Sequence, residues 1–142
     1  MTAEQNKEAF RRLFDEVFSG GDLAALDELV APDTVENQAG MQSGREGVKR
    51  LVQMLRGAFP DLRYTIEDLA AEGDKVWGRV TARGTNTGSF MGHQPTGRSM
   101  TITVIDICRF ANGQMVEHWG VADTFGALAQ LRLIPRPQPV SA

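Results

Sequence analysis

An aspartate and a histidine, Asp106 and His118, are the residue types in this sequence best suited to acid–base chemistry. They flank a turn signal, Asn112-Gly113, inside a hydrophobic stretch from Ile102 to Ala122 that is typical of two strands of a hairpin. A carboxylate that hydrogen-bonds an imidazole fixes one tautomer and tunes its basicity, as a general acid or base requires. The same spacing also fits a structural ion pair or a solvated edge.

The length of the hairpin loop decides whether these two residues meet. A two-residue loop at Asn112-Gly113 places Asp106 opposite Trp119, whereas a three-residue loop that adds Ala111 places Asp106 directly opposite His118. We favour the three-residue loop because it gives the carboxylate a partner. One face then carries Val104, Asp106, Cys108, Val116 and His118, and the other carries Ile105, Ile107, Trp119 and Val121.

Other residues are candidates for the same site. Asp123 either takes part in catalysis or caps the last helix. Trp77 and Arg79 share one strand face, from which Arg79 could bind a carbonyl or a phenolate inside a pocket. His93, in a long Gly-rich connection, either lines the pocket mouth or is an exposed loop residue. Cys108 flanks Asp106 on the pocket face, where we expect it to pack rather than to react.

The first 60 residues of the chain are expected to form helices. Apolar residues recur with helical spacing from Phe10 to Phe18, after a capping-box start in which Gln5 follows Thr2. A second helix is expected from Asp22, its cap, to Pro32, and a third from Ser43 to Pro60.

The rest of the chain has the alternation of strands. These strands are expected around residues 62–69, 76–83, 100–110 and 115–122, with turns at Gly73-Asp74 and Asn112-Gly113. A short helix is expected to start near Asp123. Helices followed by long antiparallel strands indicate an α+β fold, a cone-shaped curved sheet covered by the N-terminal helices around a pocket. We expect one domain over residues 1–134 and a Pro-rich flexible tail over residues 135–142.

Composition excludes several classes of function. The net charge is −3 and no Lys/Arg-rich run is present, which argues against a nucleic-acid-binding protein. One cysteine allows no internal disulfide, and two histidines give no metal-binding spacing, so we expect no metal. Phosphate-binding loops, dinucleotide fingerprints and nucleophile elbows are missing. The polar start of the chain and the lack of an apolar run of about 20 residues predict a soluble cytoplasmic protein.

The outer hairpin face is too apolar for exposure to water. Because either a helix or a second subunit must cover Ile105, Ile107, Trp119 and Val121, we expect a homodimer that packs sheet on sheet.

A series of short motifs resembles the SnoaL-like polyketide cyclases of the nuclear transport factor 2-like superfamily, from about residue 5 to residue 134. The motifs are Phe59-Pro60-Asp61-Leu62, Glu72-Gly73-Asp74-Lys75-Val76, Gly84-Thr85-Asn86-Thr87-Gly88, Pro95-Thr96-Gly97-Arg98, Ile105-Asp106, Asn112-Gly113, Glu117-His118-Trp119 and Asp123. The resemblance implies an α+β cone and a cofactor-free enzyme acting on an aromatic polyketide. Family members close a ring by intramolecular aldol condensation of a methyl ester, with an Asp as acid–base, and relatives are implicated in hydroxylating the anthracycline ring.

This sequence departs from the family at two positions. Members often carry His where this chain has Asn37 and Asn86, which leaves hydrogen-bonding amides in place of two imidazoles.

Three functions are compatible with the sequence. The first is a cyclase in which His118 or Asp123 is the acid–base and Asp106 orients His118. The others are an oxygen-dependent hydroxylase and a cone that binds a small molecule without catalysis.

Overall fold

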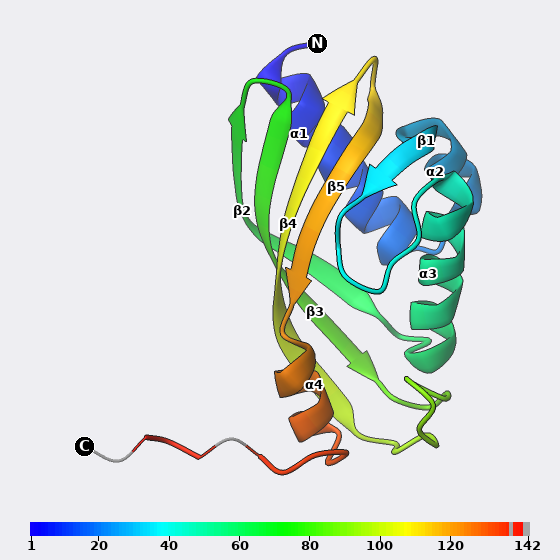
Figure 1. Cartoon of the computed structure of the whole chain (residues 1–142), viewed down its shortest axis with the longest axis vertical. Helices are drawn as coiled ribbons and strands as arrows, with labels where there is room; N and C mark the ends of the chain where they lie inside the picture. The colour runs from blue at the N-terminus through cyan, green and yellow to red at the C-terminus, as the bar shows by residue number, and fades with distance from the viewer. Residues whose placement is uncertain (137, 141–142) are drawn as a thin grey trace.

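The computed structural model describes residues 1–136 and 138–140, and its elements run from helices to strands (Figure 1). The predicted α+β fold is confirmed, as is the curved sheet, which does not close into a barrel. The helical elements are α1 (Ala3–Arg12), the π-helix η1 (Leu13–Phe18), α2 (Leu23–Leu29), α3 (Arg45–Ala58) and α4 (Thr124–Gln130). The strands are β1 (Val30–Glu36), β2 (Arg63–Glu72), β3 (Lys75–Thr85), β4 (Ser99–Ala111) and β5 (Gln114–Ala122).

The five strands form one sheet in the order β1-β5-β4-β3-β2. Its four long strands are antiparallel, as predicted, but β1 joins the edge in parallel with β5. Strand β1 was not predicted, because Pro32 and Asp33 interrupt any apolar alternation there. An edge strand tolerates such residues, since one side of its backbone pairs with no neighbour.

Three of the four predicted helix starts are confirmed. Thr2 forms a capping box with Gln5, and Asp22 and Asp123 each accept a hydrogen bond from a backbone N–H three residues on. The start expected at Ser43 is wrong, because its hydroxyl accepts from the N–H of Glu36 at 3.0 Å instead, and the helix begins after Gly44.

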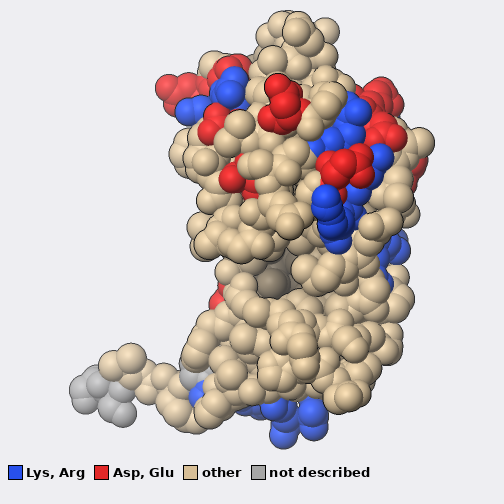
Figure 2. Space-filling model, turned by 45° about the vertical axis from the view of Figure 1, so that its right-hand side comes forward, with Lys and Arg blue, Asp and Glu red and all other residues tan. Residues whose placement is uncertain are grey.

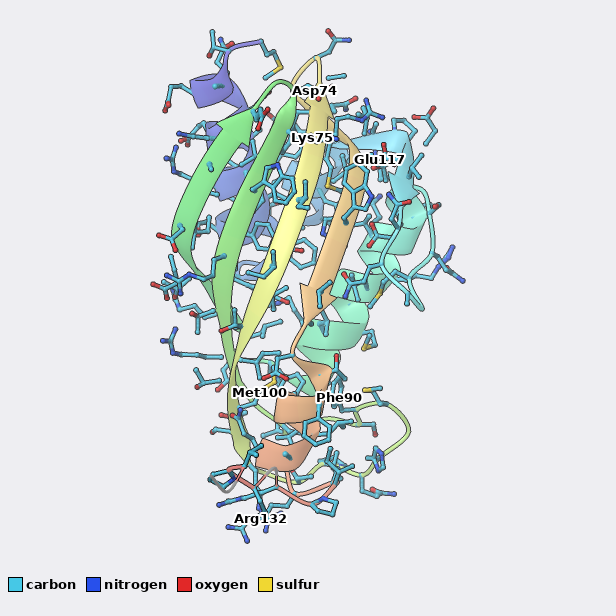
Figure 3. The ribbon with its side chains drawn as sticks, turned by 60° about the vertical axis from the view of Figure 1, so that its left-hand side comes forward. Asp74, Lys75, Phe90, Met100, Glu117 and Arg132 are labelled. Atoms are coloured by element: carbon cyan, nitrogen blue, oxygen red, sulfur yellow. The ribbon has the colours of Figure 1, made fainter. Side chains whose placement is uncertain are left out.

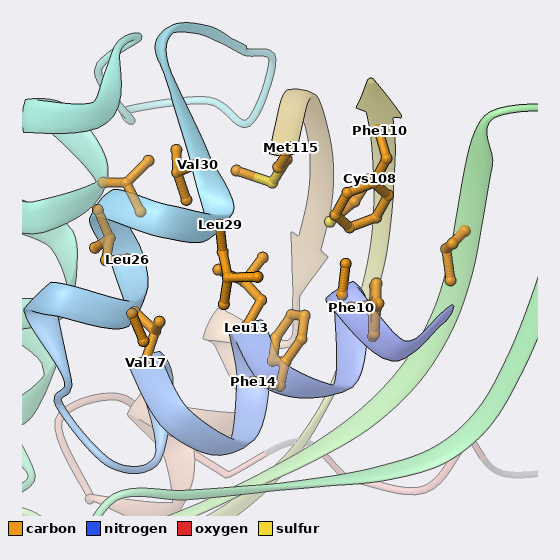
Figure 4. Close-up of a cluster of buried hydrophobic side chains, with 14 of the residues drawn as sticks. Phe10, Leu13, Phe14, Val17, Leu26, Leu29, Val30, Cys108, Phe110 and Met115 are labelled. Atoms are coloured by element: carbon orange, nitrogen blue, oxygen red, sulfur yellow. The ribbon is translucent and has the colours of Figure 1, made fainter. Parts of the chain in front are cut away.

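The first helical segment covers one end of the inner sheet face (Figure 4). Phe10, Leu13 and Phe14 point from α1 and η1 toward Cys108 and Phe110 of β4, and all five are buried. Gly78 of β3 permits this close approach, since a Cβ there would lie 2.5 Å from Cζ of Phe10. This end of the molecule is therefore a dry hydrophobic core.

The β4–β5 hairpin differs from the predicted register. Its loop has two residues, Asn112 and Gly113, with φ of 52° and 79°, as a tight hairpin turn requires. The pairing then shifts at a bulge, so that Phe110 pairs with Met115 while Arg109 pairs with Glu117. Asp106 consequently lies opposite Gly120, and the predicted direct pairing with His118 is wrong. The inner and outer faces are otherwise as predicted, because the bulge adds one residue and restores the alternation. The exception is Val116, which was expected on the inner face but is the unpaired residue of the bulge, while Met115 takes the inner position.

Part of the predicted tail lies outside the described residues. Of residues 135–142, numbers 137, 141 and 142 are not described, and the described ones are in neither helix nor strand. Within the described chain, no helix has the length and hydrophobicity needed to cross a membrane.

Candidate active site

Three buried side chains form a chain of hydrogen bonds across three strands. His118 Nε2 lies 2.7 Å from Oδ1 of Asp106, and its Nδ1 lies 2.8 and 2.7 Å from the two carboxylate oxygens of Glu36. The side chains of His118, Glu36 and Asp106 are only 13%, 6% and 5% exposed. The imidazole is thus held between two carboxylates.

The sheet register explains how these residues meet. His118 is paired with Cys108 on β4, so it reaches Asp106 diagonally, two residues along the same face. Glu36, the last residue of β1, is paired with His118 on β5. Asn37 follows and donates from its side chain to the His118 carbonyl and to Glu117, which fixes the end of β1 against β5.

The two carboxylates determine the charge of the imidazole. Burial by itself lowers the pKa of His118, but the hydrogen bonds and negative charges of Asp106 and Glu36 raise the pKa to about 9. At neutral pH the ring is therefore an imidazolium that donates through both nitrogens.

One carboxylate oxygen is left over. Oδ2 of Asp106 is buried and has no hydrogen-bond partner, whereas Oδ1 is bound to His118. Because a buried carboxylate oxygen without a partner is costly, such an atom marks a place for a ligand or for chemistry. Asp106 also lines a cavity.

The cavity has a volume of about 410 Å³ and is mostly apolar. On the face seen in Figure 2 the molecule is hollowed, and the atoms around the hollow are almost all uncharged. Met54 and Met91 line the cavity and are 46% and 57% exposed, so they give it a flexible apolar rim. Among the described lining residues, those with polar side chains are Glu36, Gln38, Tyr64, Asp106, His118 and Thr124.

The loop before β4 and the inner face of β4 form the far end of this cavity. Phe90 and Met100 lie near α4 at the end of the sheet opposite Lys75 and Glu117 (Figure 3). Both line the cavity, and Phe90 packs edge-on against Phe59, with ring centroids 5.1 Å apart. This end is therefore walled by aromatic and sulfur-containing side chains.

Two buried groups near Asp106, the Tyr64 hydroxyl and the Cys108 thiol, stay protonated. Burial and the charge of Asp106 raise the pKa of Tyr64, whose ring packs against Phe14 and Phe18 at the cavity wall. Burial, together with the charges of Asp106 and Glu36, also raises the pKa of the Cys108 thiol. Cys108 is fully buried in the hydrophobic core and does not line the cavity. A thiol in such surroundings is a packing group.

Several predicted site residues lie elsewhere. Asp123 is exposed and accepts from the Gly126 N–H at 2.9 Å as the cap of α4, outside the cavity. The pocket position expected for Trp77 and Arg79 needs correction, because both are exposed on the outer sheet face. Arg79 pairs there with Asp68 at 2.7 Å. Val76 and Val80 occupy the inner positions instead, since successive side chains of a strand alternate.

The long connection before β4 holds two further candidates, neither of which lines the cavity. Asn86 is fully buried and braces the connection, donating to the Ala58 and Gly88 carbonyls and accepting from Thr96. His93 is exposed, and its backbone pairs with that of Phe90.

Three polar lining residues were not predicted from the sequence: Glu36, Gln38 and Tyr64. Glu36 adjoins Asn37, a position considered only for its missing imidazole, and its role depends on a parallel strand pairing that the sequence did not reveal. Among the described residues, no cluster of three or more His, Cys, Asp and Glu is arranged to hold a metal ion.

The SnoaL-like polyketide cyclase family model matches residues 8–131, whereas no curated protein matches the chain. The structure of IdmH from Streptomyces antibioticus, assigned as a polyketide cyclase, is 38% identical, with a TM-score of 0.81 over 90% of this chain and 99% of IdmH.

Two further structures are similar over most of their length. AclR from Streptomyces galilaeus, assigned as a hydroxylase, is 28% identical, with a TM-score of 0.85 over 96% of this chain and 87% of AclR. TsrD from Streptomyces laurentii is 25% identical, with a TM-score of 0.87 over 94% of this chain and 99% of TsrD. These similarities support an enzyme of cyclase or hydroxylase type. Because the family model spans most of the sequence, the chain belongs to the SnoaL-like polyketide cyclase family.

Proposed function

We propose that this chain is an acid–base enzyme that closes a ring in an aromatic polyketide ester of anthracycline type by intramolecular aldol reaction. The observation that carries the proposal is the unpartnered Oδ2 of Asp106, a residue that lies beside an imidazolium and lines a mostly apolar cavity. Family membership and the similarity to IdmH support the substrate class.

In this proposal Asp106 is the base. Its Oδ2 removes a proton from a carbon next to a substrate carbonyl, the resulting enolate attacks a second carbonyl, and the proton returns to the new alkoxide. From the sequence, His118 or Asp123 was expected to be the acid–base, with Asp106 orienting His118. The geometry favours the reverse, since both ring nitrogens of His118 are occupied by carboxylates.

His118 and Glu36 then act as positioning residues. The imidazolium binds Oδ1 of Asp106 and balances the buried negative charge, which leaves Oδ2 without a partner as the basic atom. Glu36 holds the other side of the ring and sustains its charge. The acid–base steps need no cofactor.

The test is conversion of an anthraquinone-type polyketide methyl ester, followed by mass spectrometry with and without oxygen. We expect a ring-closed isomer that forms without oxygen, and an approximately thousandfold slower reaction in Asp106→Asn, as for loss of a general base. The matched control is Asp33→Asn, which removes an exposed carboxylate outside the cavity. Asp106→Asn within tenfold of the unaltered protein would overturn the proposal.

A hydroxylase is the second candidate, because AclR is similar over 96% of this chain. Here the substrate carbanion formed by Asp106 adds molecular oxygen, the substrate supplies both electrons, and the peroxide anion takes the proton back to give a hydroperoxide. An oxygen-dependent product that incorporates label from ¹⁸O₂ would establish this reaction instead of cyclisation. If ligand binds but neither product forms, the cone binds a small molecule without catalysis.

We also propose a homodimer through the outer sheet face. Trp77, Ile105 and Val121 are 48%, 42% and 73% exposed there, an apolar surface flanked by the Arg79–Asp68 ion pair. A second copy offers the same apolar residues and both signs of charge, so the face complements itself across a two-fold axis. Sedimentation of the protein should give a dimer, and Val121→Arg should give a monomer; a monomer in the unaltered protein would contradict this.

A further inference from the structure

The imidazolium at the candidate site has no proton left for a substrate. Nε2 of His118 faces Asp106 and Nδ1 faces Glu36, with all three distances between 2.7 and 2.8 Å. If Asp106 removes a proton next to a carbonyl, the negative charge that develops on that carbonyl oxygen needs a hydrogen-bond donor from another residue.

Apart from Asp106, His118 and Glu36, three of the described residues that line the cavity have a side-chain hydrogen-bond donor: Gln38, Tyr64 and Thr124. Tyr64 pairs with Ala82 of β3, which pairs with Ile102 of β4, so Tyr64 lies on a rung four residues along β4 from Asp106. Thr124 begins α4 and lies beyond Ala122, whose partner on β4 is Val104. Thr124 is therefore placed toward the far end of the cavity, whereas Tyr64 starts two strands away from Asp106 and its ring packs against Phe14 and Phe18.

Gln38 is the donor that lies beside Asp106 and His118. Three side-chain atoms converge above Gly120, which is paired with Asp106 and has no side chain of its own. A Cβ at Gly120 would lie 2.5 Å from Oε1 of Gln38, 2.8 Å from Cε1 of His118 and 2.9 Å from Oδ1 of Asp106. The carboxamide, the imidazolium and the carboxylate thus share the space that a larger residue would fill.

The neighbours of the carboxamide suit the orientation it has. Its oxygen shares the space above Gly120 with Cε1 of His118, whose C–H is polarised in the imidazolium and attracts an acceptor. The NH₂ group, a donor, is then the end available to the cavity that Gln38 lines.

We propose that Gln38 is a substrate-contacting catalytic residue, whose side-chain NH₂ donates to the carbonyl oxygen that becomes the enolate oxygen when Asp106 removes the adjacent proton. This inference rests on the proposed acid–base function. It implies that the reacting carbonyl lies in the cavity between Asp106 and Gln38, and that the reacting group is uncharged, since no described Lys or Arg lines the cavity.

The first test measures deuterium exchange of the α-protons of the polyketide methyl ester in D₂O. Gln38→Leu is expected to slow exchange about a hundredfold, as for loss of one oxyanion donor. Gln38→Asn, which keeps a shorter donor, should recover part of the rate. Gln53→Leu is the matched control, because Gln53 is exposed on α3 and does not line the cavity. Circular dichroism and thermal melting establish that each variant is folded.

The second test uses 2-naphthol, whose phenolate resembles an enolate and absorbs at a longer wavelength than the neutral form. If Gln38 donates to the oxyanion, the ratio of ionised to neutral bound naphthol should fall about tenfold in Gln38→Leu, since a donor to a charged oxygen is lost. The ratio should not change in Gln53→Leu.

The two proposals fail in different ways. If Asp106→Asn exchanges α-protons as fast as the unaltered protein, the acid–base function itself is wrong. If Asp106→Asn is inactive while Gln38→Leu matches the unaltered protein in both exchange and naphthol ionisation, only the assignment of Gln38 is overturned. A slow Gln38→Leu with unchanged naphthol ionisation also overturns it, because the residue then does not contact the oxyanion.

Discussion

The two ends of β4 show how one strand face can make either a core or a cavity. At one end Cys108 and Phe110 are 0% and 3% exposed and pack under α1. At the other end Met100, Ile102 and Val104 point to the same side of the sheet but line the cavity. The apolar alternation is the same in both halves, so the difference comes from what covers them.

Asp106 lies at the boundary between these two ends. Its partner on β3 is Gly78, over which the ring of Phe10 packs, so the dry core begins directly beside the carboxylate. On the other side Asp106 faces the cavity. The core thus supplies a rigid, water-excluding wall, and the cavity supplies access for a ligand.

The largest expected effect is a difference in the free energy of unfolding between a substitution in the core and one at the cavity. Phe10→Ala should lower the free energy of unfolding by about 3–5 kcal/mol, because it empties a fully buried site. Leu51→Ala should cost about half as much or less, because Leu51 already faces the cavity on one side. Urea denaturation measures both, and equal losses would contradict the contrast between core and cavity.

The next effect is the pH dependence of stability at the boundary. Since the folded pKa of His118 is raised to about 9 from 6.5, its contribution is fully present below pH 6.5 and is lost as the pH rises through 9. This contribution is on the order of 3 kcal/mol. Urea denaturation between pH 6 and 10 should show the loss.

His118→Gln is the control for this measurement. Cys108 also has a raised pKa, and so it adds to the loss of stability at alkaline pH in both proteins. The difference between the two proteins isolates the histidine. An unchanged slope in His118→Gln would show that the imidazole carries no extra proton in the folded state.

A smaller effect is expected from Glu36, the outer partner of the ring. Glu36→Gln removes one negative charge from beside the imidazolium, so the pKa of His118 should fall. The alkaline limb of the pH–rate profile should move to lower pH, with about a tenfold loss of rate near pH 9. Glu72→Gln, an exposed carboxylate on β2, should leave the profile unchanged. A profile that stays fixed in Glu36→Gln would remove Glu36 from the site.

The smallest effect belongs to the outer face. Arg79→Ala breaks an exposed ion pair with Asp68 and should change the free energy of unfolding by less than about 0.5 kcal/mol. The reaction rate should not change, because Arg79 does not line the cavity. A large loss of rate would show that Arg79 does act at the cavity, as predicted from the sequence.

Local patterns in the sequence were sufficient for much of the fold. Thr2, Asp22 and Asp123 cap the helices they were predicted to cap, because capping depends on residues within one turn. Strand alternation likewise separated the two faces of the β4–β5 hairpin, except at Val116 in the bulge. Ser43 shows the limit, since its hydroxyl accepts a hydrogen bond from Glu36, seven residues earlier, in place of the expected cap.

The site depends on contacts that local patterns do not encode. Asp106 and His118 meet only because a bulge shifts the register, and nothing in their spacing specifies a bulge. Glu36 reaches His118 through a parallel pairing of residues 82 positions apart. Gln38 and Gly120 come close to Asp106 and His118 only once these three strands lie side by side.

The most direct test of the account is the protonation state of His118. In ¹⁵N-histidine-labelled protein, with His93→Gln to leave one histidine signal, both ring nitrogens should be protonated at pH 7.5 and should titrate near pH 9. That result would show an imidazolium fixed between Glu36 and Asp106. A neutral ring at pH 7.5 with one unprotonated nitrogen would contradict the account, because His118 would then be free to act on a substrate itself.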